Sequence, residues 1–304
     1  MNFDVGEVLS RAGQITWKHK VLWVFSALPV LVSFLIFPLV FVPIISMGTD
    51  SRGYPVIFDE PLFIALFVVT NIIVGLLGFV LYGVGTSSVM LGILRVEGGA
   101  SQLNFRELFN DGRKYLWRIL GIMLLISLGV SAIFFALFAC VALFGAVTAG
   151  IGFICIQPLF ILLYPIMIIL YAVIEQSQAA VVADDMGVVD AITRGWNLVK
   201  ENFWRFLLIS LIIYLGITFL SSLVVMPFMA PFFFIPFLID NPQIELSTQS
   251  IILFVAAFSV ILLPVMALVQ GITITFMKAT YLLVYLRLTR GSKSQPVLLE
   301  TAPS

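Results

Sequence analysis

Six long apolar runs dominate this sequence and restrict the fold that it can adopt. They span residues 21–46, 62–94, 119–146, 151–174, 206–239 and 251–286. A helix needs about 20 residues to cross the ~30 Å hydrocarbon core of a bilayer, and every run is long enough. Composition agrees, because 61% of the residues are hydrophobic and 11% are charged, whereas soluble domains carry about 25% charged residues. We therefore predict an all-α integral membrane protein with six transmembrane helices, which excludes a soluble enzyme and a nucleic-acid-binding module.

The charges predict the orientation of these helices. Six spans divide the remaining segments into two sets, of which one holds 15 basic and 11 acidic residues and the other holds one basic and five acidic residues. The second set contains Arg52, Asp50, Asp59, Glu60, Asp240 and Glu245. Basic residues are enriched on the cytoplasmic side of membrane proteins. The pattern predicts a multi-pass protein of the plasma membrane with both termini in the cytoplasm.

Three segments that precede the first, third and fifth runs resemble one another. Residues 4–17, 104–116 and 187–200 each place apolar or small residues at positions i, i+3, i+4, i+7, i+10 and i+11, which is the stripe of an amphipathic helix. The predicted caps Asp4, Asn104 and Gly187 are each followed three residues later by an acid, namely Glu7, Glu107 and Asp190. Negative charge in the first turn suits the helix dipole. We therefore predict three amphipathic helices that lie at the membrane interface.

All five tryptophans lie near these segments, as expected at a membrane interface. The predicted architecture is three repeats of an interfacial amphipathic helix followed by a transmembrane hairpin. The repeats cover residues 4–98, 104–186 and 187–290 of a single membrane domain, 1–290, and residues 291–304 form a short cytoplasmic tail. The alternative is that such linkers precede helices in any multi-span protein and carry no repeat.

One segment carries a family resemblance. The stretch DDMGVVDAITRGWNLVKENFWRFLLISLI, with Ala191, Trp196, Leu198, Asn202 and the pair Phe203–Trp204, resembles a bacterial group of polytopic membrane proteins. That group includes the membrane domain attached to some glycerophosphoryl diester phosphodiesterases. The N-terminal VGEVLSRAGQITWKHKVLWVF also resembles stand-alone members of the group, and the resemblance implies a prokaryotic protein. The enzyme's separate catalytic barrel, with its histidines and acidic metal ligands, has no counterpart here, so we expect no phosphodiesterase activity.

Residues that could carry chemistry are scarce. The chain has one histidine, His19, and two cysteines, which are too few for a zinc or haem site of its own. We found no nucleophile–base pattern and predict no catalytic residue, no metal site and no cofactor. Prolines interrupt several runs, a feature that can mark a transporter's binding site. The spans carry no charged residue near their middle, so we favour kinks that are satisfied by neighbouring helices.

Glu175 and Lys278 are the candidate site residues. They are the charges at the margins of the apolar runs without an immediately charged neighbour, and the repeats place them, with Thr86, at matching depth. A buried carboxylate and a buried ammonium are costly alone and tolerable together. The residues would then form a buried polar pair. Alternatively, each side chain extends separately to the headgroups.

These observations favour a non-enzymatic scaffold or modulator of membrane partners or lipids. Its expected partners are the bilayer, anionic lipid or another membrane protein, and no nucleic acid. The alternative is a small-molecule or lipid transporter, which would require a water-accessible polar cavity.

Overall fold

The computed structural model describes residues 4–34, 61–148, 151–239 and 248–290, which form helices and turns without a strand in those ranges. Three short helices are α1 (Val5–Lys18), α5 (Phe105–Gly112, continued by the 3₁₀ turn η2, Arg113–Tyr115) and α8 (Val188–Glu201). The other helices are α2 (Val21–Ser33), α4 (Pro61–Glu97), α6 (Leu116–Val147), α7 (Ile151–Asp184), α9 (Phe203–Ile239) and α10 (Thr248–Arg290).

Within the described ranges, five helices are long and apolar enough to cross a membrane, which supports a multi-pass membrane protein. The candidate spans are Pro61–Glu97, Phe105–Val147, Leu163–Asp184, Phe203–Pro227 and Val260–Thr289. The first predicted run, 21–46, begins as the 13-residue helix α2. Its remainder, the outer charged segments and the tail 291–304 lie outside the described residues.

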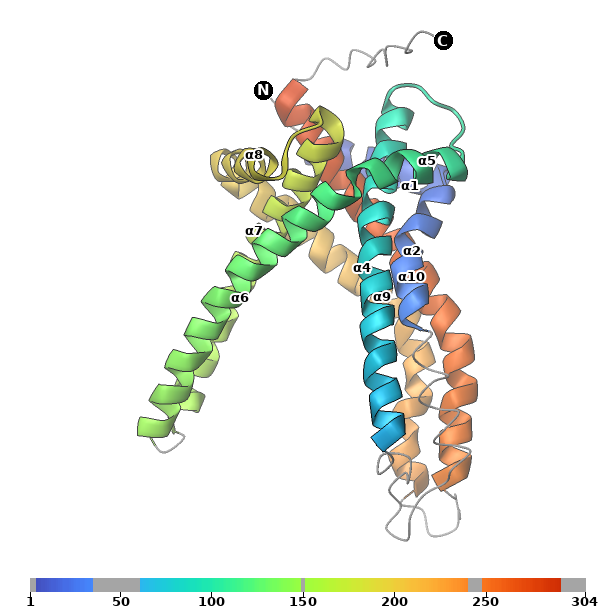
Figure 1. The fold of residues 1–304 in the computed structure, drawn as a ribbon, viewed down its shortest axis with the longest axis vertical. Helices are drawn as coiled ribbons and strands as arrows, with labels where there is room; N and C mark the ends of the chain where they lie inside the picture. Colours follow the sequence, from blue (N-terminus) through green and yellow to red (C-terminus); the bar gives the residue numbers. More distant parts are fainter. Residues whose placement is uncertain (1–3, 35–60, 149–150, 240–247, 291–304) are drawn as a thin grey trace.

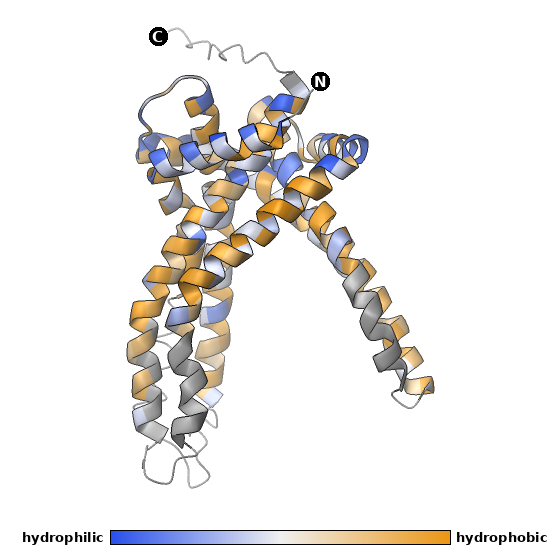
Figure 2. Cartoon of the chain, turned by 180° about the vertical axis from the view of Figure 1, so that it is seen from behind, coloured by the Kyte–Doolittle hydropathy of each residue, from blue (hydrophilic) through white to orange (hydrophobic). Residues whose placement is uncertain are grey.

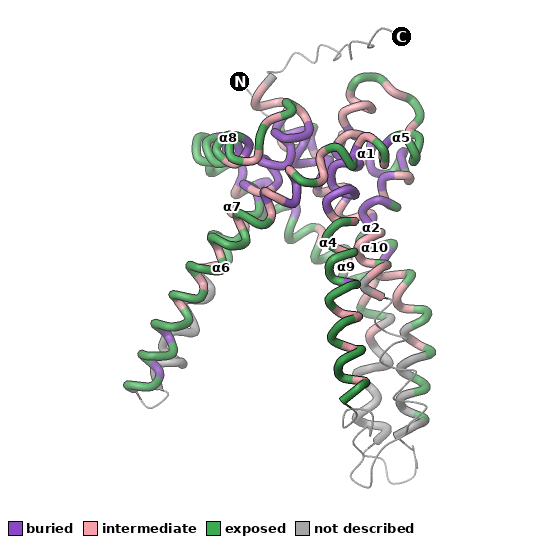
Figure 3. Tube along the Cα trace, viewed as in Figure 1, coloured by how far each residue is buried: buried purple, intermediate pink, exposed green. Residues whose placement is uncertain are grey.

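The long helices separate into two legs that meet at one end (Figure 1). One leg is formed by α6 and α7, and the other contains α4, α10 and the later part of α9. The hydrophobic residues follow the legs, whereas hydrophilic residues gather at the end where the short helices lie (Figure 2). Buried residues also concentrate at that end (Figure 3). The core is therefore built where the short helices cover the ends of the long ones.

Apart from the three short helices, the described helices contact one another in a cyclic order. The helices form the pairs α2–α4, α6–α7 and α9–α10. The second helix of each pair contacts the first helix of the next pair: α4 contacts α6, α7 contacts α9, and α10 contacts α2. The second helices α4, α7 and α10 also contact one another. Each short helix packs on the second helix of the preceding pair: α1 on α10, α5 on α4 and α8 on α7.

The three short helices lie where the sequence predicts helices. Asp4 caps α1 by accepting hydrogen bonds from the backbone N–H groups of Gly6 and Glu7, and Asn104 caps α5 in the same way through Arg106. Gly187 occupies the corresponding position before α8 without a side-chain bond. The prediction was wrong for the second segment, where the α-helix ends at Gly112 and tightens into a 3₁₀ turn instead of continuing to residue 116. Glycine is a weak helix former, which favours this ending.

Ion pairs connect the helices at the end that holds the core. They are Arg11–Glu97, Arg95–Asp111, Arg118–Asp185 and Arg287–Glu7. The hydrogen bond and the charge of Arg287 lower the pKa of the Glu7 carboxyl. All four pairs are partly exposed, and such pairs typically contribute about 0–1 kcal/mol each. Most of the stability of this end must therefore come from packing.

Close approach of the short helices depends on glycine at two positions. A Cβ atom on Gly195 of α8 would lie 2.8 Å from the backbone nitrogen of Ser177 and 3.0 Å from the carbonyl oxygen of Val173, both on α7. A Cβ atom on Gly112 of α5 would collide with Ser88 of α4. These two helix pairs can therefore touch backbone to backbone only because no side chain intervenes.

We predict that Gly195→Ala lowers the free energy of unfolding by about 1–3 kcal/mol, the usual cost of overpacking. The added methyl group meets backbone atoms, which cannot move aside as a flexible side chain can. The matched control is Gly129→Ala on α6, where an added Cβ has no atom within 4 Å. Thermal melts of the purified variants in detergent test the difference. Equal melting temperatures for the two variants would contradict the proposed close contact.

Candidate functional site

The structure brings the two predicted site residues together. Glu175 projects from α7 and Lys278 from α10, and the Lys278 Nζ atom donates a hydrogen bond to Glu175 Oε1 at 2.7 Å. Their side chains are 0% and 1% exposed. In this structure they form a buried ion pair, and neither side chain reaches the surface separately.

Tyr82 and Gln178 join the ion pair, and we call these four residues, Tyr82, Glu175, Gln178 and Lys278, the polar junction. Lys278 Nζ also donates to Gln178 Oε1 at 2.6 Å and lies 5.5 Å from the centre of the Tyr82 ring. Gln178 Nε2 in turn donates to the Tyr82 hydroxyl at 3.4 Å. The polar junction therefore links α4, α7 and α10, the three long helices that contact one another at the centre of the fold.

Hydrogen bonds extend from this region to α9. Gln176 Nε2 donates to the carbonyl oxygen of Tyr281 at 3.1 Å, and the Tyr281 hydroxyl contacts Ser210 Oγ at 2.8 Å. The rings of Tyr171 and Tyr281 meet edge to face with their centroids 5.9 Å apart. Gln176, Ser210 and Tyr281 are all buried. Polar groups in this region are thus used to hold long helices against one another.

The helix that carries Glu175 is longer than its apolar run. The sequence predicts a membrane helix over residues 151–174, but α7 continues to Asp184. The additional residues include the polar stretch Glu175–Gln176–Ser177–Gln178, each with no exposed surface. A helix can bury such residues when neighbouring helices satisfy their polar groups. Hydropathy alone does not detect this part of the helix because the compensating groups lie on α4 and α10.

The geometry of the pair favours a structural role. A buried ion pair must offset the large cost of removing two charges from water, so its geometry and its additional hydrogen bonds decide whether it is tolerated. Lys278 has both a carboxylate and an amide oxygen as acceptors. Glu175 Oε2 and Gln176 Oε1 are buried and accept no hydrogen bond from the described residues. The arrangement can therefore fix the register of α7 against α10, at some cost in unsatisfied polar atoms.

Sequence reasoning missed Tyr82 and Gln178. Thr86 was expected to join the pair from the first repeat, and it is buried, but the contact from α4 comes from Tyr82, one helical turn earlier. Gln178 lies three residues after Glu175, on the same side of α7. The spacing of Gln178 could have indicated its involvement, whereas Tyr82 required knowledge of how α4 is rotated.

Residues suited to metal binding do not gather elsewhere in the described ranges. They contain no group of three or more histidine, cysteine, aspartate or glutamate side chains that could hold a metal ion. Comparison with models of protein families, with curated proteins and with solved structures finds no match.

Proposed function

We propose that this chain is a non-enzymatic scaffold or modulator of membrane partners or lipids. The observation that carries the proposal is the exposure of the α4 and α6 surfaces. In each of these helices only 6% of the most hydrophobic 18-residue window is buried. Such surfaces are covered by lipid or by the helices of other membrane proteins. The α6–α7 leg in particular diverges from the other long helices (Figure 1), and in the proposed arrangement the exposed sides of α6 face lipid or a partner helix.

The proposed architecture is three repeats that close into a ring. The cyclic contacts support it, because α1, α5 and α8 each pack on the second long helix of the preceding pair. The glycines of the second and third repeats occupy the same position of the predicted stripe, and each lies against a serine of its partner helix. Residues 191–204 keep their resemblance to the bacterial polytopic group, which supports a prokaryotic origin as part of this proposal.

The proposed location is the plasma membrane, with both termini in the cytoplasm. Support comes from the basic residues near the short helices and from three tryptophans at that end, Trp17, Trp117 and Trp204, which are 68%, 78% and 77% exposed. An exposed indole suits the headgroup region, where one edge of the ring can meet water. Basic residues beside an anionic leaflet add about 1 kcal/mol each to membrane attachment.

Transport receives no support from the polar junction. A transported solute needs a polar cavity that water can enter, whereas Glu175 and Lys278 are packed away from solvent. This burial supports a structural role for Glu175 and Lys278, which form the only fully buried ion pair among the described residues.

Photo-crosslinking in cells tests the scaffold proposal. We predict that a benzophenone amino acid at Ile72 of α4 or at Leu128 of α6, which are 56% and 61% exposed, yields discrete adducts with another membrane protein. The same group at the buried Ile122 of α6 is the control and should yield none. If both exposed positions formed adducts with lipid alone, a protein scaffold would be excluded.

A further inference from the structure

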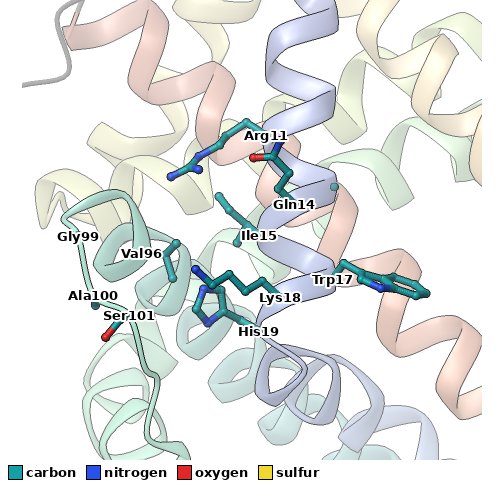
Figure 4. Close-up of a pocket in the computed structure, with 11 residues that line it drawn as sticks. Arg11, Gln14, Ile15, Trp17, Lys18, His19, Val96, Gly99, Ala100 and Ser101 are labelled. Carbon is teal, nitrogen blue, oxygen red and sulfur yellow. The ribbon is translucent and has the colours of Figure 1, made fainter.

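A basic pocket lies beside the C-terminal half of α1 (Figure 4). Arg11, Gln14, Lys18 and His19 contribute polar side chains, and the segment Gly99–Ser101 after α4 closes the other side. Its volume is about 760 Å³, within the ~300–1,000 Å³ that is usual for ligand pockets. The pocket is therefore large enough for a small anionic group and its surroundings.

The donors of this pocket are only partly used within the described protein. Arg11 Nε donates to Glu97 at 2.8 Å, and the guanidinium has further N–H groups to offer. Lys18 is exposed and forms no ion pair with any described residue. Burial, together with the charges of Lys18 and Arg11, lowers the pKa of His19. A neutral imidazole still provides one N–H donor, so the pocket combines two cations with a neutral donor.

An apolar pocket of about 400 Å³ adjoins α1 on another side. It lies between α1, α9 and α10, and isoleucines and valines from α9 and α10 form much of its wall. Gly216 of α9 faces open space, since a Cβ atom built there has no atom within 4 Å. The pocket contains few polar groups, as expected for a place that receives hydrocarbon.

Gly13 and Trp17 line both pockets. Gly13 has no side chain to separate them, and the Trp17 ring points away from the side chains of Arg11 and Lys18 (Figure 4). Trp17 and Trp23 lie with ring centroids 5.6 Å apart, and tryptophan is the residue that marks the level of the headgroups. A basic pocket and an apolar pocket thus adjoin at the expected membrane interface.

We propose that these two pockets form one binding site for an anionic phospholipid. The phosphate lies against Arg11, Lys18 and His19, and an acyl chain passes the Gly13–Trp17 edge into the pocket between α9 and α10. Cationic side chains suit a phosphate, and the apolar pocket excludes an anion that lacks a chain. The inference rests on the proposed function and deepens it, because it names the lipid that the protein would recognise.

The test is native mass spectrometry of the full chain in mild detergent, with added dioleoyl phosphatidylglycerol or dioleoyl phosphatidylcholine. We expect the wild type to retain phosphatidylglycerol preferentially. Lys18→Gln should weaken that binding about fivefold, the usual effect of one cationic side chain. Lys20→Gln is the matched control. It removes the same charge two residues further along the chain, and Lys20 lines neither pocket. Equal affinities for the two variants would overturn the headgroup site.

A second pair of variants tests the apolar pocket. Gly216→Leu should fill it and weaken binding of both lipids, whereas Gly129→Leu, on an open face of α6, should leave binding unchanged. Retention of lipid by Gly216→Leu at the wild-type level would overturn the acyl-chain site. Glycerol phosphate, which has no chain, should not displace the lipid, and displacement at equal concentration would indicate a soluble phosphate ligand instead. Crosslinks from α4 and α6 do not involve these residues, so failure of the lipid site is distinguishable from failure of the scaffold.

Discussion

Replacement of Lys278 by methionine is expected to destabilise the protein by about 3–5 kcal/mol, the usual effect of removing one partner from a buried ion pair. The loss would leave the Glu175 carboxyl group, which is 0% exposed, without its cationic partner, and it would also remove the donor that satisfies Gln178 Oε1. A melting temperature measured by fluorescence-detected size exclusion in detergent gives the readout. Lys200→Met, at an exposed lysine of α8, controls for the loss of a cation.

The double variant Glu175→Gln, Lys278→Met separates the cost of an unpaired charge from the value of the pair. Neutralising both residues removes the buried charge, so we expect the double variant to recover much of the stability lost by the single one. Exchange of the two charges, Glu175→Lys with Lys278→Glu, should likewise recover more folded protein than either reversal alone. A melting temperature for Lys278→Met equal to that of Lys200→Met would show that the buried pair contributes nothing.

The second large effect concerns the orientation of the protein in the membrane, because a single cysteine is either labelled from outside the cell or not labelled at all. In a background with Cys140→Ser and Cys155→Ser, we predict that Thr148→Cys, at the end of α6, reacts with a membrane-impermeant maleimide in intact cells. Ser101→Cys, in the segment between α4 and α5, should react only after the membrane is permeabilised. The physical reason is the excess of basic residues on the side of the short helices.

Two outcomes decide the orientation. Labelling of Ser101→Cys alone in intact cells would reverse the proposed topology. Labelling of both positions without permeabilisation would mean that the segment between α4 and Thr148 does not cross the bilayer. Detergent-solubilised samples of both variants provide the control, because each cysteine should then be modified to the same extent.

The local features of this protein follow from neighbouring residues in the sequence. The apolar runs determine where five candidate spans lie, because the number of apolar residues needed to cross a bilayer is fixed by the rise of a helix. Asp4 and Asn104 cap α1 and α5 through side chains that reach only two or three residues along the chain. Burial of Val8 and Ala12 on α1 likewise follows the predicted stripe.

Contacts between distant segments were decided by the tertiary structure. The sequence suggests that Glu175 and Lys278 lie at similar depth, but it does not specify their rotation about the helix axes, which gives Lys278 contacts with Tyr82 and Gln178 as well. These contacts join residues about 100 positions or more apart, and Gln178 lies on the part of α7 that continues beyond the predicted run to Asp184. The sequence pattern also does not predict the divergence of the α6–α7 leg. Hydropathy indicates that a helix lies in lipid, but it does not indicate which other helices that helix contacts.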